Sequence, residues 1–217
     1  MEKTLRTIPA NSRILDAGAG TQRYRKYCQH LQYVSQDFAQ YDGKGNDHAL
    51  QTGQYNYGKL DIVSDITSIP EPDGSFDAIL CVEVLEHVPD PVLAVKEFSR
   101  LVKSGGHLIL TAPFCSLTHY APYHFSTGFN TYWYNTHLVN AGFQIVELDP
   151  NGNYFEYLAQ EVYRIPAIAQ RYAKSKPNPF EMASIYVLQR MLARFSRRDT
   201  GSSEVLCYGY DVYARKL

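Results

Sequence analysis

Short apolar runs alternate along the chain with segments of helical spacing, and this alternation restricts the fold more than any other feature. The expected strands are Arg13–Asp16, Tyr33–Asp37, Leu60–Asp65, Phe76–Val82, His107–Ala112 and Phe143–Leu148, with Val205–Arg215 as the last. The expected helices are Gln22–Leu31, Val92–Val102 and Thr131–Ala141. Strands that are apolar nearly throughout, separated by helices, predict an α/β protein whose mostly parallel sheet is covered on both faces.

Glycines and two long segments interrupt this alternation of strands and helices. Lys103-Ser-Gly-Gly106 predicts the end of the second helix, and Gly142 predicts the end of the third. Gln40–Lys59 is rich in Gly, Asn, Gln and Tyr without clear periodicity, and a loop of that length is usually functional. Residues 150–204 predict a helical insertion within a single domain of 217 residues.

Within the insertion, apolar residues recur at helical spacing. They are Met182, Ile185, Leu188, Met191, Leu192 and Phe195, while Arg190, Arg194, Arg197 and Arg198 lie off this stripe. Residues 151–204 contain eight Lys/Arg and five Asp/Glu, a net charge of +3, against −4 for the rest of the chain. We expect this helix to be a lid, or to pack on the domain or on a second subunit in a homodimer. A helix at a membrane surface is the alternative.

The composition is that of an ordinary globular protein. The chain is 45% hydrophobic and 20% charged with a net charge of −1, so it has no overall attraction to nucleic acid. Its cysteines form no CxxC pair, which favours a reducing compartment over a disulfide framework or a zinc site. Neither a signal-peptide core nor a bilayer-spanning run is present. We therefore expect a soluble, cytoplasmic protein.

The loop after the first expected strand brings bare backbone to the edge of the sheet. Residues 14–21 read ILDAGAGT, in which Gly18 and Gly20 follow Asp16. Ligands of open α/β folds bind at the carboxyl ends of the strands, and glycine allows close approach to the backbone. The third glycine of G-x-G-x-x-G is replaced by Arg23, and no G-x-x-x-x-G-K-[ST] loop is present. A cofactor with a pyrophosphate is therefore disfavoured.

Further motifs follow in a fixed order. The second strand ends at Asp37 in YVSQDF, and the third ends at Asp65-Ile66 in LDIVSDITSIP, before FDAILCVEVLEHVPDP and LVKSGGHLILTAPF. In this order the sequence resembles the class I S-adenosylmethionine-dependent methyltransferases, most closely the small-molecule group with the EVLEHV signature. The resemblance covers residues 13–149 and the last strand. It implies a Rossmann-like fold with seven strands, S-adenosyl-L-methionine as cofactor and S-adenosyl-L-homocysteine as product.

The resemblance also implies contacts for individual residues. Gly18 and Gly20 would let backbone amides approach the methionine part of the cofactor, with Asp16 near its ammonium group. Asp37 would accept from both ribose hydroxyls, because one carboxylate offers two acceptor oxygens. The other implied contacts are Phe38 beside the adenine, Asp65 and the Ile66 amide at its edge, and Cys81 and Val82 on the methionine side. Many relatives have glycine where this chain has Gln22, which leaves the entry into the next helix open.

Methyl transfer to a hydroxyl is helped by a general base, and histidine is the usual choice near neutral pH. His124 is the first candidate and His119 the second, because both follow the fifth strand, where edge loops would face the methyl group. Aromatic residues near them would form a wall for the acceptor, although each ring could equally belong to the core. These are Tyr120, Tyr123, Phe125 and Trp133.

Glu83, Glu86 and His87 lie at positions i, i+3 and i+4, on one face of a helical turn. The same spacing occurs in proteins that resemble the ubiquinone-pathway O-methyltransferases, where a divalent cation has been proposed, and in many relatives without a known metal. We expect these residues to close the turn after the fourth strand, and we assign no metal ligand.

The acceptor side is expected to be covered by residues 113–130, by the 40–59 loop and by the insertion, with Asn151–Glu156 at the same rim. Cys115–Phe129 and NGNYFEYLAQE resemble methyltransferases associated with bacterial surface-glycan biosynthesis, which implies a sugar, nucleotide-sugar or lipid-linked glycan. Walls rich in tyrosine suit sugar faces and flat acceptors alike.

Nucleic acid is a poor acceptor for this chain, which has neither an Asn/Asp-Pro-Pro-Tyr motif nor a Pro-Cys nucleophile after the fourth strand. The sequence favours methyl transfer to an O- or N-nucleophile of a small molecule, with a sugar or glycan precursor as one class. One alternative is a quinone-like or lipidic acceptor at the membrane surface, with peripheral membrane contact. Another is a non-catalytic scaffold with a methyltransferase fold.

Overall fold

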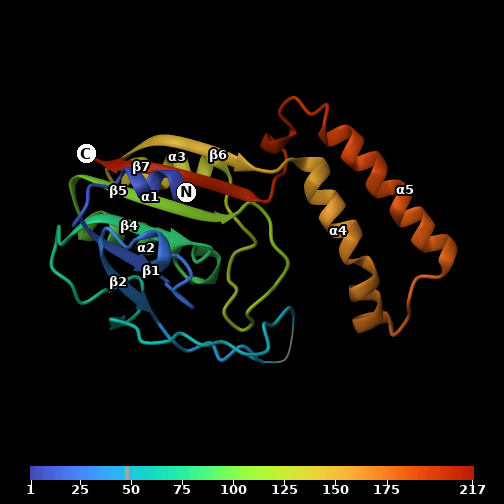
Figure 1. Cartoon of the computed structure of the whole chain (residues 1–217), viewed down its shortest axis with the longest axis horizontal. Coiled ribbons are helices and arrows are strands. Elements are labelled where there is room, and N and C mark those ends of the chain that lie inside the picture. The colour runs from blue at the N-terminus through green and yellow to red at the C-terminus, as the bar shows by residue number, and fades with distance from the viewer. Residues whose placement is uncertain (47–48) are drawn as a thin grey trace. The chain divides into compact units, whose positions relative to one another are not determined.

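The structure is a computed structural model that describes residues 1–46 and 49–217. The chain divides into two compact units: unit 1 comprises Met1–Asp149 and Gly209–Leu217, and unit 2 comprises Pro150–Tyr208. Figure 1 shows strands and helices in unit 1, whereas unit 2 is helical. The organisation as one domain with an insertion at 150–204 stays a prediction.

Unit 1 is built on a seven-stranded sheet with the strand order β3-β2-β1-β4-β5-β7-β6 (Figure 1). The strands are β1 (Arg13–Ala17), β2 (Gln32–Asp37), β3 (Ile62–Val63), β4 (Phe76–Val82), β5 (Val102–Pro113), β6 (Phe143–Asn151) and β7 (Gly209–Lys216). Strands β1 to β5 pair in parallel, and β7 is antiparallel to β5. The predicted α/β fold with a mostly parallel sheet is confirmed.

The helices of unit 1 are α1 (Glu2–Thr7), α2 (Pro91–Leu101) and α3 (Thr131–Asn140), with the short 3-10 helices η1 (Arg25–Tyr27) and η2 (Leu85–His87). Helix α2 begins at a strong start signal: the Asp90 carboxylate accepts from the amides of Val92 and Leu93 at 3.1 Å each. Pro91 occupies the first turn, where its missing N–H is not needed. Helix α3 is capped in the same way by Asn130.

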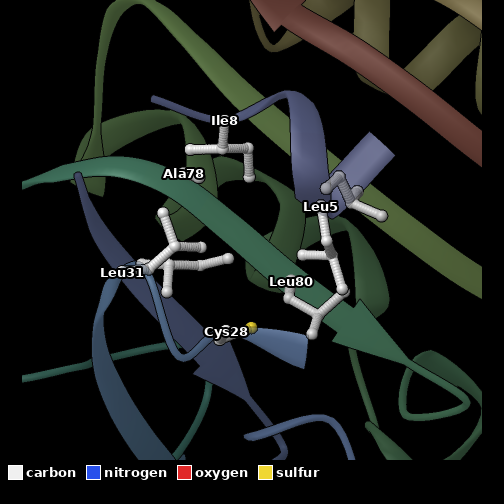
Figure 2. Packing of buried hydrophobic residues seen from close by; sticks show 8 residues of the cluster. Leu5, Ile8, Cys28, Leu31, Ala78 and Leu80 are labelled. Atoms are coloured by element: carbon white, nitrogen blue, oxygen red, sulfur yellow. The ribbon is translucent and has the colours of Figure 1, made fainter. Parts of the chain in front are cut away.

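A hydrophobic cluster covers one face of the sheet (Figure 2). It consists of Leu5, Ile8, Ile14, Cys28, Leu31, Ala78, Leu80 and Ile109, so the N-terminal segment and the chain between β1 and β2 pack against β4. Successive strand residues point to opposite faces. The residues that alternate with cluster members, such as Leu15 and Ile79, are also fully buried. The sheet is therefore covered on both faces, as predicted.

The helix predicted at Gln22–Leu31 is wrong. The segment consists of turns around the short helix η1, from which Cys28 and Leu31 reach the core. Gln22 has φ +57°, in the left-handed region, and an α-helix of L-residues cannot continue through that conformation.

Side-chain hydrogen bonds hold Gln22 in this conformation. Its Nε2 donates to the carbonyl oxygens of Tyr57 and Lys59, each at 2.8 Å, and its Oε1 accepts from Arg25 at 2.9 Å. Glycine is the residue that usually adopts this region, and glycine has no side chain with which to make such bonds. Gln22 therefore ties the end of the 40–59 loop to the turn after β1.

The glycines expected to stop α2 have a different role. Helix α2 ends because Val102 is already extended, with ψ 138°, and begins β5. Residues 103–106 form an irregularity in the pairing of β5 with β4, which shifts register between Phe76 and Ala78. A Cβ on Gly106 would lie 2.9 Å from the carbonyl oxygen of Asp77, so close packing against β4 requires glycine there.

Several strand limits differ from the predictions, and β6, for one, ends at Asn151 rather than Leu148. Strand β3 is shorter than Leu60–Asp65. The last strand begins at Gly209 rather than Val205, because the amide of Val205 donates at 3.0 Å to the carbonyl of Ser202 and closes a helical turn. Apolar residues in a turn and in a strand give the same local pattern.

Unit 2 contains α4 (Tyr154–Ile168), a π-helical turn η3 (Ala169–Ala173), α5 (Pro179–Ser196) and the 3-10 turn η4 (Ser202–Glu204) (Figure 1). Asn153 caps α4, and Asn178 forms a capping box with Glu181 at the start of α5. Across the described residues, the longest and most apolar helices still fall short of what a bilayer crossing requires.

Replacement of Gln22 tests its two roles. Gln22→Ala should lower the free energy of unfolding by about 1–2 kcal/mol, because the two hydrogen bonds to the loop are lost while the left-handed backbone remains. Gln22→Gly loses the same bonds but adopts this backbone freely, so it should be more stable than Gln22→Ala by about 1 kcal/mol. Urea unfolding measures both values, and equal stability of the two variants would contradict the backbone argument.

Candidate active site

A pocket of about 290 Å³ lies where the chain leaves the carboxyl ends of β1, β2, β3 and β4. Five residues predicted to contact the cofactor line it: Gly18, Asp37, Phe38, Asp65 and Ile66. This is the edge at which open parallel sheets bind ligands. The topology therefore brings residues from three separate motifs to one cavity.

Asp37 links the end of β2 to the glycine loop. Its Oδ2 accepts from the Gly20 amide at 2.9 Å, and its Oδ1 accepts from the Ala39 amide at 3.0 Å. Burial raises the pKa of Asp37 above its ordinary value, and the bonds from these amides oppose that rise. Each carboxylate oxygen has a further lone pair, so the group can still accept from a ligand in the pocket.

The glycines of the loop are required by close neighbours. Gly18 has φ +73°, and a Cβ there would lie 2.5 Å from a methyl carbon of Val84. Gly20 has φ +52°, and a Cβ there would lie 2.4 Å from the hydroxyl of Tyr55. Any side chain at either position would meet a side chain of the pocket wall.

Asp16 lies beneath the loop rather than in the wall that the described residues form. It is 2% exposed, and the hydroxyl of Tyr33 donates to its Oδ2. Burial raises the pKa of Asp16 to about 7, and the bond from Tyr33 acts in the opposite direction. The carboxyl group is therefore partly protonated near neutral pH.

The adenine-side residues lie in the wall, but the methionine-side pair does not. Asp65 lines the pocket beside Ile66, and its Oδ1 accepts from the amide and hydroxyl of Thr67. Cys81 is fully buried and Val82 packs on the core cluster, so both stand outside the described wall. The chain then turns at Glu83, which has φ +54°, and it is Glu83 and Val84 that line the pocket.

Three tyrosines of the 40–59 loop form a wall that the sequence did not identify residue by residue. Tyr41, Tyr55 and Tyr57 line the pocket, next to the predicted Tyr120. The rings of Tyr41 and Tyr120 stack at 4.6 Å between centroids, and Tyr55 meets Tyr57 edge-on at 4.9 Å. The signal was the tyrosine-rich composition of the 40–59 loop, which does not specify which rings turn inward.

Two loops that were predicted to cover the pocket are joined to each other. The amide of Leu50 donates to the carbonyl of Thr118 at 3.2 Å, and the amide of Tyr120 donates to the carbonyl of Leu50 at 3.0 Å. Both loops contribute residues to the wall. Residues 47 and 48 of the predicted loop lie outside the described residues. Cover from the insertion and from Asn151–Glu156 stays a prediction.

The predicted histidines gather next to the pocket rather than in its wall. His119 and His124 have ring centroids 4.9 Å apart, and His87 lies 4.7 Å from His119. Among the described wall residues, the one histidine is His87. Burial lowers the pKa of His124, with His119 as a second cause, and its Nε2 lies 3.2 Å from the hydroxyl of Ser116.

Of the four aromatic residues predicted to face the acceptor, three line the pocket: Tyr120, Tyr123 and Phe125. Trp133 lies elsewhere, because the Asn130 cap starts α3 there and its ring packs at 4.6 Å from Phe129.

His87 has one tautomer imposed by its surroundings. Its Nδ1 lies 2.5 Å from the carbonyl oxygen of Tyr123, which can only accept, so Nδ1 carries the proton and Nε2 is an acceptor. Burial lowers the pKa of His87 to about 4, so the ring is neutral at physiological pH. The ring also stacks on Tyr120, with centroids 5.1 Å apart.

A carboxylate and two imidazoles could hold a divalent ion beside this ring. Glu86, His87 and His119 offer ligand atoms within 4.8 Å of one another. Glu86 is 1% exposed, and its Oε2 has no hydrogen-bond partner among the described residues. The Oε1 of Glu83 instead accepts from Thr111 at 2.8 Å, so the geometry differs from the Glu83-Glu86-His87 set considered from the sequence.

The buried carboxyl of Asp16 makes stability depend on pH. Its folded pKa of about 7 exceeds the ordinary 3.8, so the folded state retains a proton that the unfolded state loses, and stability falls as pH rises from about 4 to about 7. Asp16→Asn should remove this dependence and be more stable than the unchanged protein at pH 8, with a difference that shrinks toward pH 4. Thermal unfolding across this range measures it.

Asp61 provides a contrast of opposite sign. Bonds from the amide and hydroxyl of Ser35 lower the pKa of Asp61, so Asp61→Asn should lose stability at pH 8. If Asp16→Asn also lost stability at pH 8, the raised pKa of Asp16 would be contradicted.

Comparison with known proteins identifies the fold and its domain. Residues 15–110 match a family model described as a methyltransferase domain. A ubiquinone biosynthesis O-methyltransferase from Xanthomonas axonopodis pv. citri (strain 306) is 37% identical over 110 residues, which are 49% of this chain and 45% of that protein. A similar protein from Dechloromonas aromatica (strain RCB) is 42% identical over 65 residues, 30% of this chain and 27% of that protein. The matched stretch thus spans less than half of these curated relatives.

The fold also matches solved structures along nearly the whole chain. A SAM-dependent methyltransferase from Archaeoglobus fulgidus has a TM-score of 0.59 at 17% identity, covering 99% of this chain and 90% of that one. At this identity the likeness shows the fold. Residues 15–110 therefore match a methyltransferase domain, and together with the fold of solved methyltransferases this match supports a class I S-adenosylmethionine-dependent methyltransferase.

Proposed function

We propose that unit 1 binds S-adenosyl-L-methionine in its pocket and transfers the methyl group to an O- or N-nucleophile of a small molecule. The methyltransferase domain supports the reaction class. One observation carries the assignment of the pocket: the Asp37 carboxylate at the end of β2 is bonded to the Gly20 amide and also lines the cavity. A carboxylate placed by the glycine loop can accept from the two hydroxyls of a ribose while that loop receives the amino-acid end.

The remaining polar groups fit the same ligand. Asp65 is an acceptor suited to the adenine amino group, and Phe38 offers a ring at the same wall. The Tyr55 hydroxyl stands beside Gly20 and can donate to a carboxylate, while burial raises the pKa of Tyr55, so that it stays protonated. When bound, the cofactor supplies a methyl group already activated on a sulfonium. The chain's task is then to align the acceptor, exclude water and accept a proton.

His87 is the base that the geometry favours. It lines the pocket, its Nδ1–H donates to Tyr123, and its Nε2 can therefore accept a proton from a hydroxyl acceptor. The low pKa keeps the ring unprotonated at neutral pH, although it also makes the base weak. His119 and His124 stay candidates from the sequence, because their rings adjoin His87 and could receive the proton in turn.

A quinone-like or phenolic acceptor is the class that the curated relatives favour. Those relatives are named ubiquinone biosynthesis O-methyltransferases, and the cofactor motifs of this chain lie within the methyltransferase domain matched at residues 15–110. Flat rings also suit a wall in which Tyr41 and Tyr120 stack. A sugar or glycan acceptor and a cytoplasmic location stay predictions of the sequence. Because less than half of each relative is matched, the substrate is proposed for this chain and not inherited from them.

Removal of the Asp37 carboxylate tests the cofactor site. Asp37→Ala should weaken the binding of S-adenosyl-L-homocysteine by about 1–3 kcal/mol, because charged hydrogen bonds to the ribose are lost. Isothermal titration calorimetry measures the affinity, with Glu147→Ala as a control that removes an exposed carboxylate from β6. Equal affinity in both variants would exclude the ribose role of Asp37, and no binding by the unchanged protein would exclude the proposed function.

The base is tested by comparing three histidine variants. A screen of catechol-type phenols, quinols and nucleotide sugars first identifies an acceptor. With it, His87→Gln should lower kcat by roughly 10²-fold or more, whereas cofactor affinity stays near that of the unchanged protein. His119→Gln and His124→Gln should retain more activity than His87→Gln. A loss confined to His124→Gln would assign the base to His124 and exclude His87.

A further inference from the structure

Helix α5 exposes most of its apolar residues. The exposed fractions are 85% for Phe180, 66% for Val187, 37% for Leu188, 36% for Met191 and 39% for Phe195. Their spacing of i, i+7, i+8, i+11 and i+15 places them along one face of the helix. The predicted stripe was expected to pack on the domain or on a second subunit, with a membrane surface as the alternative; within α5, Leu192 is the buried residue, at 5% exposure. Phe195 packs against Phe155 of α4, with ring centroids 5.5 Å apart, and the other four residues form an apolar face of α5 that unit 2 leaves exposed.

A row of cations runs beside this face. Arg190, Arg194 and Arg197 follow at i, i+4 and i+7 and so share one side of α5, and Arg198 adds a fourth charge. Among the residues that the structure describes, none forms an ion pair with these arginines. An exposed apolar face with arginines along its edge has the pattern of a helix that lies in a lipid interface.

The turn between α4 and α5 continues the same pattern. It contains Arg171, Lys174 and Lys176 and no acidic residue between positions 162 and 180. Tyr172 within the turn is 60% exposed, and the exposed Phe180 lies in the first turn of α5, where the α4–α5 turn ends. Basic residues interleaved with exposed aromatic rings are attracted to anionic headgroups while the rings enter the acyl boundary.

Most carboxylates of unit 2 already form hydrogen bonds or ion pairs within the unit. This disfavours a second copy of unit 2 as the partner. Glu161 pairs with Arg164, Glu181 closes the capping box of α5, and Asp199 accepts from the amide of Ser202. Glu156 accepts from the hydroxyl of Ser196. Two facing copies would bring two arginine rows together and double the net charge of +3 that each unit 2 carries. An anionic lipid surface supplies the missing negative charge.

We infer that unit 2 is a membrane-docking module: the apolar face of α5, together with the basic α4–α5 turn, binds the surface of a bilayer that contains anionic lipids. The module lies on the membrane, since across the described residues the helices are too short or too polar to cross it. This inference does not rest on methyl transfer. It would nevertheless bring a lipidic acceptor within reach of the chain.

Vesicle co-sedimentation tests the inference on the full chain. The unchanged protein should sediment with vesicles of phosphatidylcholine and phosphatidylglycerol and remain in solution with phosphatidylcholine alone. Arg190→Gln with Arg194→Gln should weaken binding by roughly tenfold or more, because each basic residue near an anionic surface contributes on the order of 1 kcal/mol. The control Lys3→Gln with Lys96→Gln removes the same charge from exposed positions of unit 1 and should bind as the unchanged protein does.

The apolar contribution has its own matched pair. Val187 and Val139 are 66% and 55% exposed, the first on α5 and the second on α3 of unit 1. Val187→Ser should weaken vesicle binding several-fold, whereas Val139→Ser should not, and circular dichroism checks that both variants remain folded. Equal binding to neutral and anionic vesicles, or no vesicle binding at low salt, would overturn the inference. So would a dimer in light scattering that Val187→Ser dissociates, because the face would then belong to a second copy.

Discussion

The hydrogen bond between the Asp37 carboxylate and the Gly20 amide is the contact on which the candidate site depends. It joins the end of β2 to the loop after β1, at one of the two glycines where close neighbours leave no room for a side chain. Without Asp37 the loop amide would lose its acceptor, and the pocket would lose its buried carboxylate together with the geometry of its floor. The same carboxylate thus holds the loop and, in the proposed function, has lone pairs left for the ribose of the cofactor.

Part of the pocket wall is built from two loops that are hydrogen-bonded to each other. Leu50 bonds to both Thr118 and Tyr120, and Gln22 holds the far end of the 40–59 loop. Ring stacking of Tyr41, Tyr120 and His87 continues from one loop through the other to the turn after β4. The aromatic wall, the proposed base and the path of the loop therefore depend on one another. Unit 2 has a surface of its own, the apolar and arginine-rich side of α5.

Much of the sheet and part of the site were accessible from local patterns. Strand β4 was predicted with its observed limits, because an apolar run of that length between turn signals has few alternatives. Asp37 and Asp65 were found because strand ends of a parallel sheet meet at one edge. The segment after β1 was mistaken for a helix, because its apolar spacing is helical, whereas its backbone forms i to i+3 turns after the left-handed Gln22.

By itself, the sequence determined the α/β class, most of the strand order along the chain and some residues at the carboxyl edge, such as Gly18, Asp37 and Asp65, because each follows from periodicity or from turn chemistry within a few residues. Only the tertiary structure decided that His87 rather than His124 lines the pocket, which tyrosines turn inward and which face of α5 is exposed. These depend on contacts between segments distant in sequence, such as Leu50 with Tyr120, and local patterns carry no information about such contacts.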